Sequence, residues 1–365
     1  MTAASSAFSS TYKQAREQFL EAADRARLQV ESKPLPLKGR DGETLAMDIA
    51  REGDPDAACL LVLTSACHGV EGFCGSGVQV AALRDEEWRS HAARLGVAVL
   101  YVHALNPFGF SHWRRATQEN VDLNRNFHDY SKPLPVNGAY GEVHELMLPG
   151  QWPPPAASEA RLMQWIATHG EAAFQAAVSG GQHEFPDGLF FGGTSPTWSN
   201  LAIRDVLRAH GRHAARIGWI DIHTGLGPAG VGERIFCGHD DEATLRRARA
   251  WWDGGGRTPV TSIYDGSSTS AFLTGMMFSA AYEECPQAEY TGMALEYGTL
   301  PMIETLQALR AEHWLHLHPE APLQLAAQIK QQIKDAFYVD TPEWKERVLG
   351  QAREALFQAA DGLSG

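Results

Sequence analysis

Short apolar runs alternate with longer amphipathic segments along most of this chain. Strand-sized, strongly apolar runs lie at 59–64, 97–102, 217–222 and 293–297, and weaker ones at 173–179 and 234–237. Helical spacing of apolar residues marks 78–95, 158–169, 200–215 and 242–252. Strands that alternate with helices of this length form parallel crossovers, because each helix carries the chain back along the sheet. We therefore expect an α/β fold, a single domain with a mixed, mostly parallel central sheet flanked by helices.

Amphipathic helices are expected at both ends of the chain. Residues 12–30 place apolar side chains at three- and four-residue steps. Residues 323–360 also have a helical pattern, in which Pro342 opens a last helix after Thr341. The Pro- and Gly-rich stretches 133–155 and 254–270 are too long for simple connections, and we expect them to shape a site. The expected division is an N-terminal amphipathic helix at 1–35, a main domain at 36–320 and packed C-terminal helices at 321–365.

The charge balance argues against a nucleic-acid partner. The 365 residues include 31 Lys and Arg against 44 Asp and Glu, a net charge of −13, and no run of Lys or Arg forms a basic stripe. No apolar stretch approaches the roughly 20 residues that a membrane helix needs. Residues 1–10 are small and polar and lack the apolar core of a signal peptide, so we expect a cytoplasmic protein. The sequence predicts no oligomeric state.

The cysteines indicate reduced thiols and exclude a Cys-rich zinc finger. The chain has no Cys-x-x-Cys pair. Its five cysteines are Cys59, Cys67, Cys74, Cys237 and Cys285. Any metal must therefore be bound by His, Asp and Glu side chains.

Candidate metal ligands stand at the ends of the strongly apolar runs. His68 and Glu71 come just after 59–64, and His223 directly follows 217–222. Glu296 lies within the run 293–297. In open parallel sheets, ligands bind outside the carboxyl ends of the strands, so these side chains could converge. Two histidines and a carboxylate form a three-ligand zinc set that leaves a fourth position open, as in catalytic sites.

Each candidate also has a structural explanation. The His-x-x-Glu spacing alone is weak evidence, because the run from His239 to Glu242 fits it and is better explained as the start of a helix. His223 alone could be a buried core histidine, and Asp221 could either support it or be unrelated. Glu296 is harder to explain in this way, since burying an unpaired charge is costly unless a metal-bound water or a cation lies nearby.

The segment after the second strong strand concentrates guanidinium and amide side chains. Within 113–127 these are Arg114, Arg115, Arg125, Asn120, Asn124 and Asn126. Guanidinium groups bind carboxylates through two parallel hydrogen bonds and can polarise a carbonyl. A solvated loop is the alternative, although the mixture of arginine, asparagine and aromatic residues is unusual for one.

Taken in order, these residues resemble the zinc metallocarboxypeptidase superfamily. The matching elements are His68-x-x-Glu71, Asn106-Pro107-x-Gly109, Val121-Asp122-Leu123-Asn124-Arg125-Asn126-Phe127, Asp221-x-His223 and Glu296. They span 67–299, and the Asn-Arg-Asn element combined with His-x-x-Glu is highly specific. The chain is more narrowly similar to a bacterial subset of undefined function, and it is similar in its motifs to the related aspartoacylase and succinylglutamate desuccinylase branch.

The resemblance implies a fold like that of zinc carboxypeptidases and a catalytic metal. One zinc ion per chain would be bound by His68, Glu71 and His223. Glu296 would act as general base on the zinc-bound water.

The resemblance also implies roles in substrate binding. Arg115 corresponds by position to the arginine that stabilises the oxyanion, with Arg114 as the adjacent candidate. Asn124 and Arg125 correspond to the pair that binds the substrate carboxylate. The family's substrate-capping tyrosine has two candidates, and neither stands in a matching motif: Tyr264 and Tyr282.

The implied activity is hydrolysis of an amide or peptide bond next to a free carboxylate, with a small peptide or an N-acyl amino acid as substrate. One alternative is an N-acyl amino acid deacylase of the aspartoacylase type. Another is a carboxylate-binding protein without turnover.

Other enzyme classes fit the sequence less well. Residues 225–230 match the Gly-x-Gly-x-x-Gly fingerprint of dinucleotide binding, but the strand-like run 234–237 follows too soon for the required helix. Cys67, Cys74 or the serines at 267–270 could serve a covalent hydrolase, yet the chain has no Gly-x-Ser-x-Gly elbow.

Overall fold

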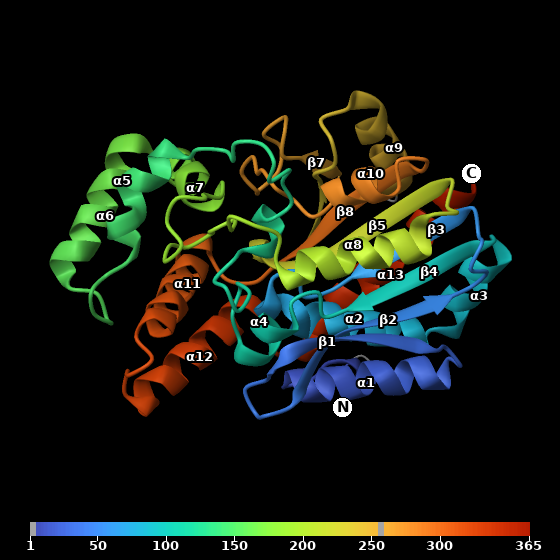
Figure 1. Cartoon of the computed structure of the whole chain (residues 1–365), viewed down its shortest axis with the longest axis horizontal. Coiled ribbons are helices and arrows are strands. Elements are labelled where there is room, and N and C mark those ends of the chain that lie inside the picture. The colour runs from blue at the N-terminus through green and yellow to red at the C-terminus, as the bar shows by residue number, and fades with distance from the viewer. Residues whose placement is uncertain (1–4, 255–258) are drawn as a thin grey trace.

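A computed structural model describes residues 5–254 and 259–365 and shows one mixed sheet. Eight strands of this part of the chain pair in the order β1-β2-β4-β3-β5-β8-β6-β7 (Figure 1). Their bounds are β1 Val30–Lys38, β2 Thr44–Glu52, β3 Cys59–Thr64, β4 Val97–His103, β5 Arg216–Ala229, β6 Gly232–Phe236, β7 Val260–Ser262 and β8 Glu289–Gly298. The pairs β4–β3, β3–β5, β5–β8 and β6–β7 are parallel, and the other three are antiparallel. The predicted α/β fold is confirmed.

Both faces of the sheet are covered by helices. Along β3, Leu61 and Leu63 join one hydrophobic cluster and Leu60 and Val62 join another, because successive side chains of a strand point to opposite faces. The first cluster includes residues of α1 (Tyr12–Arg25), α2 (Gly72–Arg84), α3 (Glu86–Arg94), α9 (Glu242–Trp252) and α13 (Pro342–Ser364). The second includes residues of α8 (Trp198–Gly211) and α10 (Ser279–Glu284).

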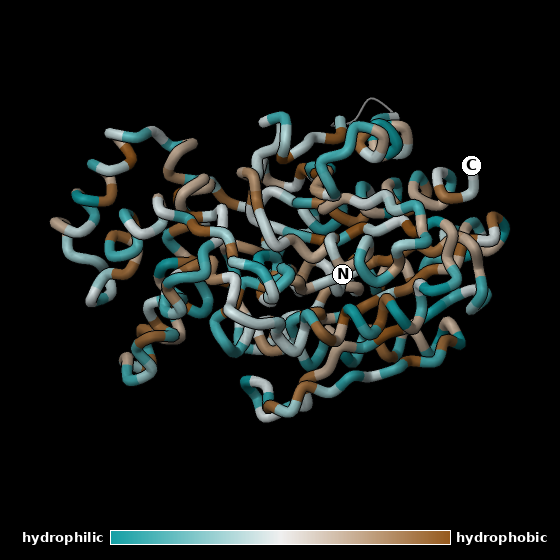
Figure 2. Tube along the Cα trace, turned by 45° about the horizontal axis from the view of Figure 1, so that its top comes forward, coloured by the Kyte–Doolittle hydropathy of each residue, from teal (hydrophilic) through white to brown (hydrophobic). Residues whose placement is uncertain are grey.

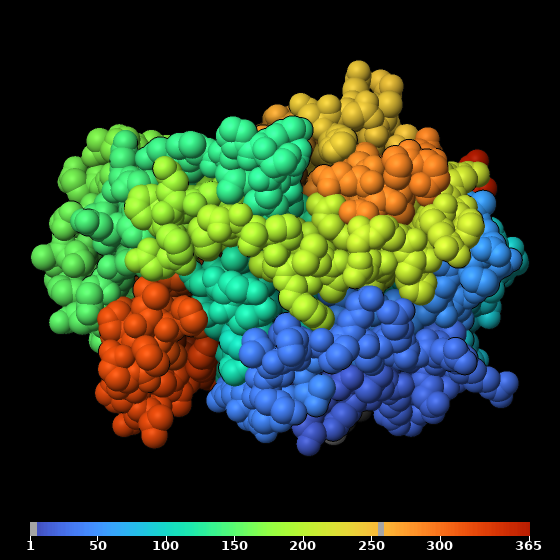
Figure 3. Space-filling view, viewed as in Figure 1, coloured from blue at the N-terminus to red at the C-terminus, as the bar shows by residue number. Residues whose placement is uncertain are grey.

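Five further helices gather at one end of the sheet, and we call them the end lobe. They are α5 (Gly138–Met147), α6 (Ala156–His169), α7 (Glu171–Ser179), α11 (Met302–Leu317) and α12 (Leu323–Phe337). These helices come from two chain segments, 138–179 and 302–337, and Figure 3 shows the green surface of the first beside the red-orange surface of the second. A separate hydrophobic cluster holds the end lobe together, with Phe174 from α7, Leu309 from α11 and Ile333 from α12.

Most of the helices are amphipathic, whereas α2 is buried along almost its whole length. Their colouring alternates between hydrophobic and hydrophilic along their length (Figure 2). Among the described residues, no helix combines the length and the hydropathy required to cross a membrane.

Most predicted elements are present, and three predictions were wrong in detail. Residues 173–179 were expected as a weak strand but belong to α7, since an Ala-rich run suits a helix as well as a strand. Residues 78–95 were expected as one helix, but the chain breaks at Asp85, which caps α3 through the Trp88 N–H. The stretch 133–155 was expected as a loop and contains α5.

The last helix begins as predicted, with Pro342 in its first turn and Thr341 as its cap. The predictions for 1–10 and 254–270 fall partly on residues 1–4 and 255–258, which lie outside the described residues. The division at 35 and 320 stays a prediction.

Candidate metal centre

A glycine allows the turn after β3 to present His68 and Glu71. The chain leaves β3 through the short 3-10 turn Gly69–Glu71 and enters α2. A Cβ at Gly69 would lie 2.1 Å from the carbonyl carbon of Gly109, so the two backbones can approach this closely only without a side chain. The Gly69 N–H donates to the carbonyl of Arg115 at 3.1 Å. The ligand-bearing turn is therefore fixed to the arginine-containing loop.

His223 and Glu296 face the same region from two neighbouring strands. They are register partners across the parallel pair β5–β8. The Leu226 N–H donates to Glu296 Oε1 at 2.9 Å, and the carboxylate is buried. Burial, together with the nearby charge of Glu71, raises the pKa of Glu296 to about 8.

Three donor groups converge as predicted. His68 Nδ1 lies 2.9 Å from Glu71 Oε1, and His223 Nδ1 lies 3.0 Å from Glu71 Oε2. The two Nδ1 atoms are 3.2 Å apart. All three side chains are buried, and their donor atoms lie within 4.8 Å of one another. One cation could contact all three.

A carboxylate contacts Nε2 of each histidine and so orients the ring. His68 Nε2 lies 3.1 Å from Asp122 Oδ1, and His223 Nε2 lies 2.6 Å from Asp221 Oδ2. Asp221 in turn accepts a hydrogen bond from the Thr64 hydroxyl at 2.6 Å. A carboxylate that accepts the Nε2 proton leaves Nδ1 free to bind a metal. The sequence reasoning assigned no role to Asp122, although it lies within the Asp-Leu-Asn-Arg element.

The electrostatics of the cluster favour a bound cation. Four buried carboxylates, those of Glu71, Asp122, Asp221 and Glu296, surround the two histidines, with Arg115 as the arginine that contacts two of them. Buried carboxylates that outnumber their cations are costly, so the donor set suits a divalent ion.

The pKa shifts of the donors reflect the same crowding. Burial alone would lower the pKa of His223, but Asp221 and Glu71 outweigh it and raise the pKa well above its usual value. Burial alone would raise the pKa of Glu71, but the two histidines lower it well below its usual value. Glu71 is therefore ionised, as a metal ligand must be.

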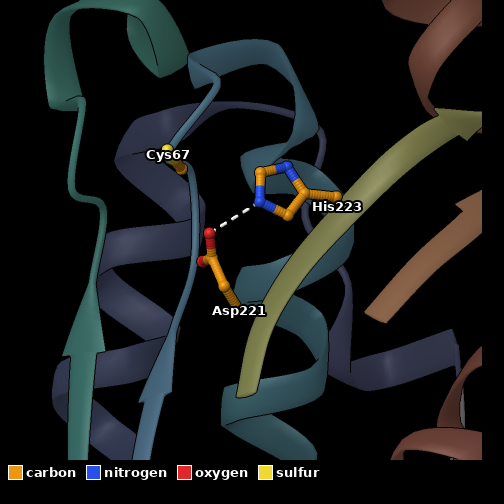
Figure 4. Close-up of side chains that lie close together, drawn as sticks. All are labelled: Cys67, Asp221 and His223. Atoms are coloured by element: carbon orange, nitrogen blue, oxygen red, sulfur yellow. Dashed lines mark hydrogen bonds and ion pairs between the residues drawn. The ribbon is translucent and has the colours of Figure 1, made fainter. Parts of the chain in front are cut away.

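A second group of donors shares His223 and is the weaker candidate. Cys67 and Asp221 lie with His223 within 4.8 Å, and Figure 4 shows Asp221 directed at the ring of His223 and Cys67 at the end of the adjacent strand. Burial raises the pKa of the Cys67 thiol well above its usual value, which disfavours the thiolate that binds metals. Cys67 does not line the cavity described below.

Arg115 lies directly at the donor set. Its Nε donates to Asp122 Oδ2 at 2.9 Å, and its Nη1 donates to Glu71 Oε1 at 3.2 Å. Nη2 also lies 2.8 Å from His68 Nε2, which is a contact and not a hydrogen bond when Nε2 carries the proton that Asp122 accepts. The guanidinium is also 5.0 Å from the ring centroid of Phe190. These contacts fix a cation beside the donor atoms.

Arg125 and Asn124 lie on the same cavity and contact backbone groups. Arg125 donates to the carbonyl of Ser179 from Nε and Nη2, at 3.0 and 2.6 Å, and to the carbonyl of Asn124 at 2.9 Å. Burial lowers the pKa of Arg125. The side-chain oxygen of Asn124 accepts the N–H of Met277 at 2.9 Å.

The structure does not bring Arg114 to this site. Its Nε lies 3.1 Å from Glu312 Oε1, and Lys330 Nζ reaches the same oxygen at 2.7 Å. The other guanidinium nitrogens contact His316 and Asn120. Arg114 therefore joins the loop to α11 and α12, and substrate binding by Arg114 has no support from its position.

Arg114→Ala is expected to destabilise the fold rather than weaken substrate binding. Removing one partner of a buried charge pair typically costs 3–5 kcal/mol, and because Lys330 still contacts Glu312 we expect a loss of about 3 kcal/mol in the free energy of unfolding. Urea denaturation measures it. The control Arg246→Ala removes an exposed pair with Glu242 and should cost less than about 0.5 kcal/mol. A stable Arg114→Ala protein with weaker substrate binding would contradict this role.

A cavity of about 490 Å³ opens over the donor set. Its polar lining includes the predicted residues His68, Glu71, His223, Glu296, Arg115, Asn124 and Arg125. Neither Tyr264 nor Tyr282 lines it. The Tyr264 hydroxyl donates to the Gly238 carbonyl, and that of Tyr282 accepts the His239 N–H at 3.1 Å. The cavity is therefore formed without a tyrosine among the described residues.

The fold is similar to that of solved metallocarboxypeptidases. Carboxypeptidase A from Helicoverpa armigera matches with a TM-score of 0.52 and 14% identity, over 97% of this chain and 73% of that one. Metallo-carboxypeptidases from Burkholderia cenocepacia (TM-score 0.47, 12% identity, 96% and 68% covered) and Pseudomonas aeruginosa (0.45, 15%, 95% and 69%) also match. The match to the Helicoverpa enzyme places the fold in the metallocarboxypeptidase class and confirms the resemblance seen in the sequence.

The chain belongs to DUF2817, a family described as protein of unknown function, whose model matches residues 8–351. A search of curated proteins gives no match.

Proposed function

We propose that this protein is a zinc-dependent hydrolase that cleaves an amide or peptide bond next to a free carboxylate. The observation that carries the proposal is the convergence of His68, Glu71 and His223 on one cavity together with Glu296 and Arg115. A single buried histidine or glutamate could be structural, but this combination has the ligands, the base and the fixed cation of a hydrolytic site.

His68, Glu71 and His223 would hold the metal. The set of two nitrogens and one carboxylate suits zinc and leaves coordination positions open, although other divalent ions can occupy such sets. A bound zinc ion would supply Lewis acidity, which polarises a carbonyl and lowers the pKa of water.

Glu296 is proposed as the proton acceptor. Its Oε1 is fixed by the Leu226 N–H, and it faces the cavity beside His223. Burial and the nearby charge of Glu71 raise the pKa of Glu296 to about 8. A metal ion bound to Glu71 would offset the Glu71 charge and lower the pKa of Glu296 toward neutral pH, where a carboxylate is an effective base.

Arg115, Arg125 and Asn124 are proposed to bind the substrate. Arg115 is held in place by Asp122 and Glu71, so it can stabilise negative charge that develops on the carbonyl oxygen without reorganising. Arg125 carries a buried positive charge whose hydrogen bonds go to backbone carbonyls, and a substrate carboxylate would be a stronger partner.

Metal content and hydrolysis together test the proposal. Protein purified without added metal or chelator should contain about one zinc per chain by plasma mass spectrometry, as a three-ligand site predicts. The protein should then hydrolyse members of a panel of C-terminal peptides and N-acyl amino acids, and amidation of the terminal carboxylate should abolish the reaction if Arg125 binds it.

Three outcomes would refute or redirect the proposal. No zinc after purification and no uptake at micromolar zinc would refute the metal site. Bound zinc with binding but no cleavage of any panel member would favour a carboxylate-binding protein, and cleavage of N-acyl amino acids alone would favour a deacylase.

A further inference from the structure

The end lobe contributes an apolar wall to the cavity, and further apolar lining residues, among them Ile235, Ile263 and Leu273, lie outside the end lobe. The members of the wall come from α6, α7, α11 and the end of α12. They are Met163, Ile166, Phe174, Val178, Met302, Ile303, Leu306, Leu309 and Phe337. Phe174, Val178, Leu309 and Phe337 belong to the hydrophobic cluster of the end lobe, and Ile166 and Leu306 pack against it. The core of the end lobe is therefore continuous with the cavity.

Part of this apolar wall is open to solvent. Met163 is 54% exposed, Ile303 45% and Met302 41%, and all three line the cavity. Scattered exposed apolar residues need no explanation, but Met302 and Ile303 are neighbours in α11 and line one cavity together with Met163, and apolar residues grouped around a cavity mark a binding surface. The wall thus has the features of a subsite for an apolar group.

The apolar wall adjoins the donor set and the proposed base. The Phe337 carbonyl accepts a hydrogen bond from the hydroxyl of Thr224, the residue after His223, at 2.7 Å. A Cβ at Gly225 would lie 2.8 Å from the Phe337 ring. α11 begins at Met302, shortly after Glu296 in β8.

The proposed carboxylate clamp lies between the segment 271–277 and α7 of the end lobe, because Arg125 donates to the carbonyl of Ser179. Asn124 accepts the N–H of Met277, and the Phe127 N–H donates to the carbonyl of Gly275 at 3.0 Å. The α7 part of the wall therefore adjoins the clamp, and the part formed by Phe337 and α11 adjoins the donor set. A substrate with its carboxylate at Arg125 and its amide at the donor set would have its acyl portion beside Phe337 and α11.

We propose that the apolar wall is an acyl-binding subsite, and that the substrates are amides in which a long apolar acyl group is joined to an amino acid. The inference rests on the proposed function, because that function sets the direction in which the substrate lies in the cavity. A fatty acyl chain and the apolar residues of a peptide share this chemistry. Among the described residues that line the cavity, Glu171 is the one charged residue of the end lobe. Its negative charge disfavours an acidic acyl group such as succinyl.

A substrate series tests the subsite. We would compare N-acetyl-, N-octanoyl- and N-succinyl-leucine with the peptide Phe-Phe-Leu, using leucine because Ile263 and Leu273 line the cavity near the clamp. The octanoyl compound, the peptide or both should exceed N-acetyl-leucine in kcat/KM by about 10- to 100-fold, since each buried methylene contributes to binding. The faster of the two identifies the source of the acyl group. Equal rates for acetyl, octanoyl and peptide substrates, or a preference for succinyl, would overturn the inference.

A matched pair of variants assigns the effect to the wall. Met302→Gln in α11 should lower the octanoyl-to-acetyl ratio of kcat/KM about fivefold by making the wall more polar beside the donor set. Leu201→Gln changes an exposed apolar residue, 52% exposed, on α8 and outside the cavity, and should leave the ratio unchanged. An unchanged ratio in Met302→Gln would contradict the subsite.

Binding without turnover separates this inference from the proposed function. Calorimetry on the Glu296→Gln protein should show tighter binding of N-octanoyl-leucine than of N-acetyl-leucine by about 10-fold or more. Tighter octanoyl binding, together with no cleavage of any panel member by the unaltered protein, would support the subsite and refute the hydrolase. Cleavage of all acyl groups at equal rates, with equal binding, would do the reverse.

Discussion

Glu296→Gln is expected to lower kcat by about 10²- to 10⁴-fold while the protein still binds one zinc ion. The substitution keeps the size of the side chain and an oxygen that can accept the Leu226 N–H. It removes the group that accepts a proton, and general base catalysis typically contributes a factor of this size. Steady-state kinetics on a cleaved panel substrate measure the loss, and plasma mass spectrometry measures the metal.

The control for this variant is Glu289→Gln at the other end of the same strand. Glu289 is partly exposed and lies 3.3 Å from Arg247, far from the donor set in the strand register. Its substitution should leave kcat unchanged. Turnover retained in Glu296→Gln would show that another group accepts the proton.

His223→Ala should lose both the metal and the activity. The variant removes one of three donor atoms and leaves Glu71 and Asp221 without their shared histidine. Loss of an outer carboxylate alone typically weakens metal binding 10- to 100-fold, so loss of a ligand should weaken it by more than about 100-fold. Competition with a chromogenic chelator measures the change in zinc affinity.

His239→Ala is the matched control, because His239 belongs to the second His-x-x-Glu in the chain and stacks on Tyr282 at 3.7 Å. It should leave zinc affinity unchanged. If His223→Ala kept its zinc and His239→Ala lost it, the assignment of the metal centre would be reversed.

The convergence of the donor set was predictable from the sequence because it follows from topology. His68, His223 and Glu296 stand at the carboxyl ends of strands that read as apolar runs, and neighbouring parallel strands bring those ends together. Edge strand β1 was not predicted, since it carries two prolines and polar residues and reads as a loop. Its partner β2 was not predicted either, because the burial of β2 depends on packing against segments that are distant in the sequence.

The roles of adjacent arginines could not be separated in the sequence. Arg114 and Arg115 follow Trp113, which adopts a left-handed conformation with φ of 55° and caps the C-terminus of α4 (Pro107–His112). Arg114 turns toward Glu312, a residue 198 positions away, while Arg115 turns toward the donor set. Long-range partners of this kind decide which side chain reaches a site, and no local pattern records them.

The spacing of the ligands along the chain also determines when the site can form. His68 and His223 are 155 residues apart, and the crossover helices, β4 and three helices of the end lobe lie between them in sequence. Closing such a long segment is entropically costly before the sheet contacts exist. A chain emerging from the ribosome has only two of the three ligands until β5 has been made. Metal loading at the proposed centre would therefore be a late event in the maturation of this protein, and a bound ion would strengthen the completed sheet rather than start its assembly.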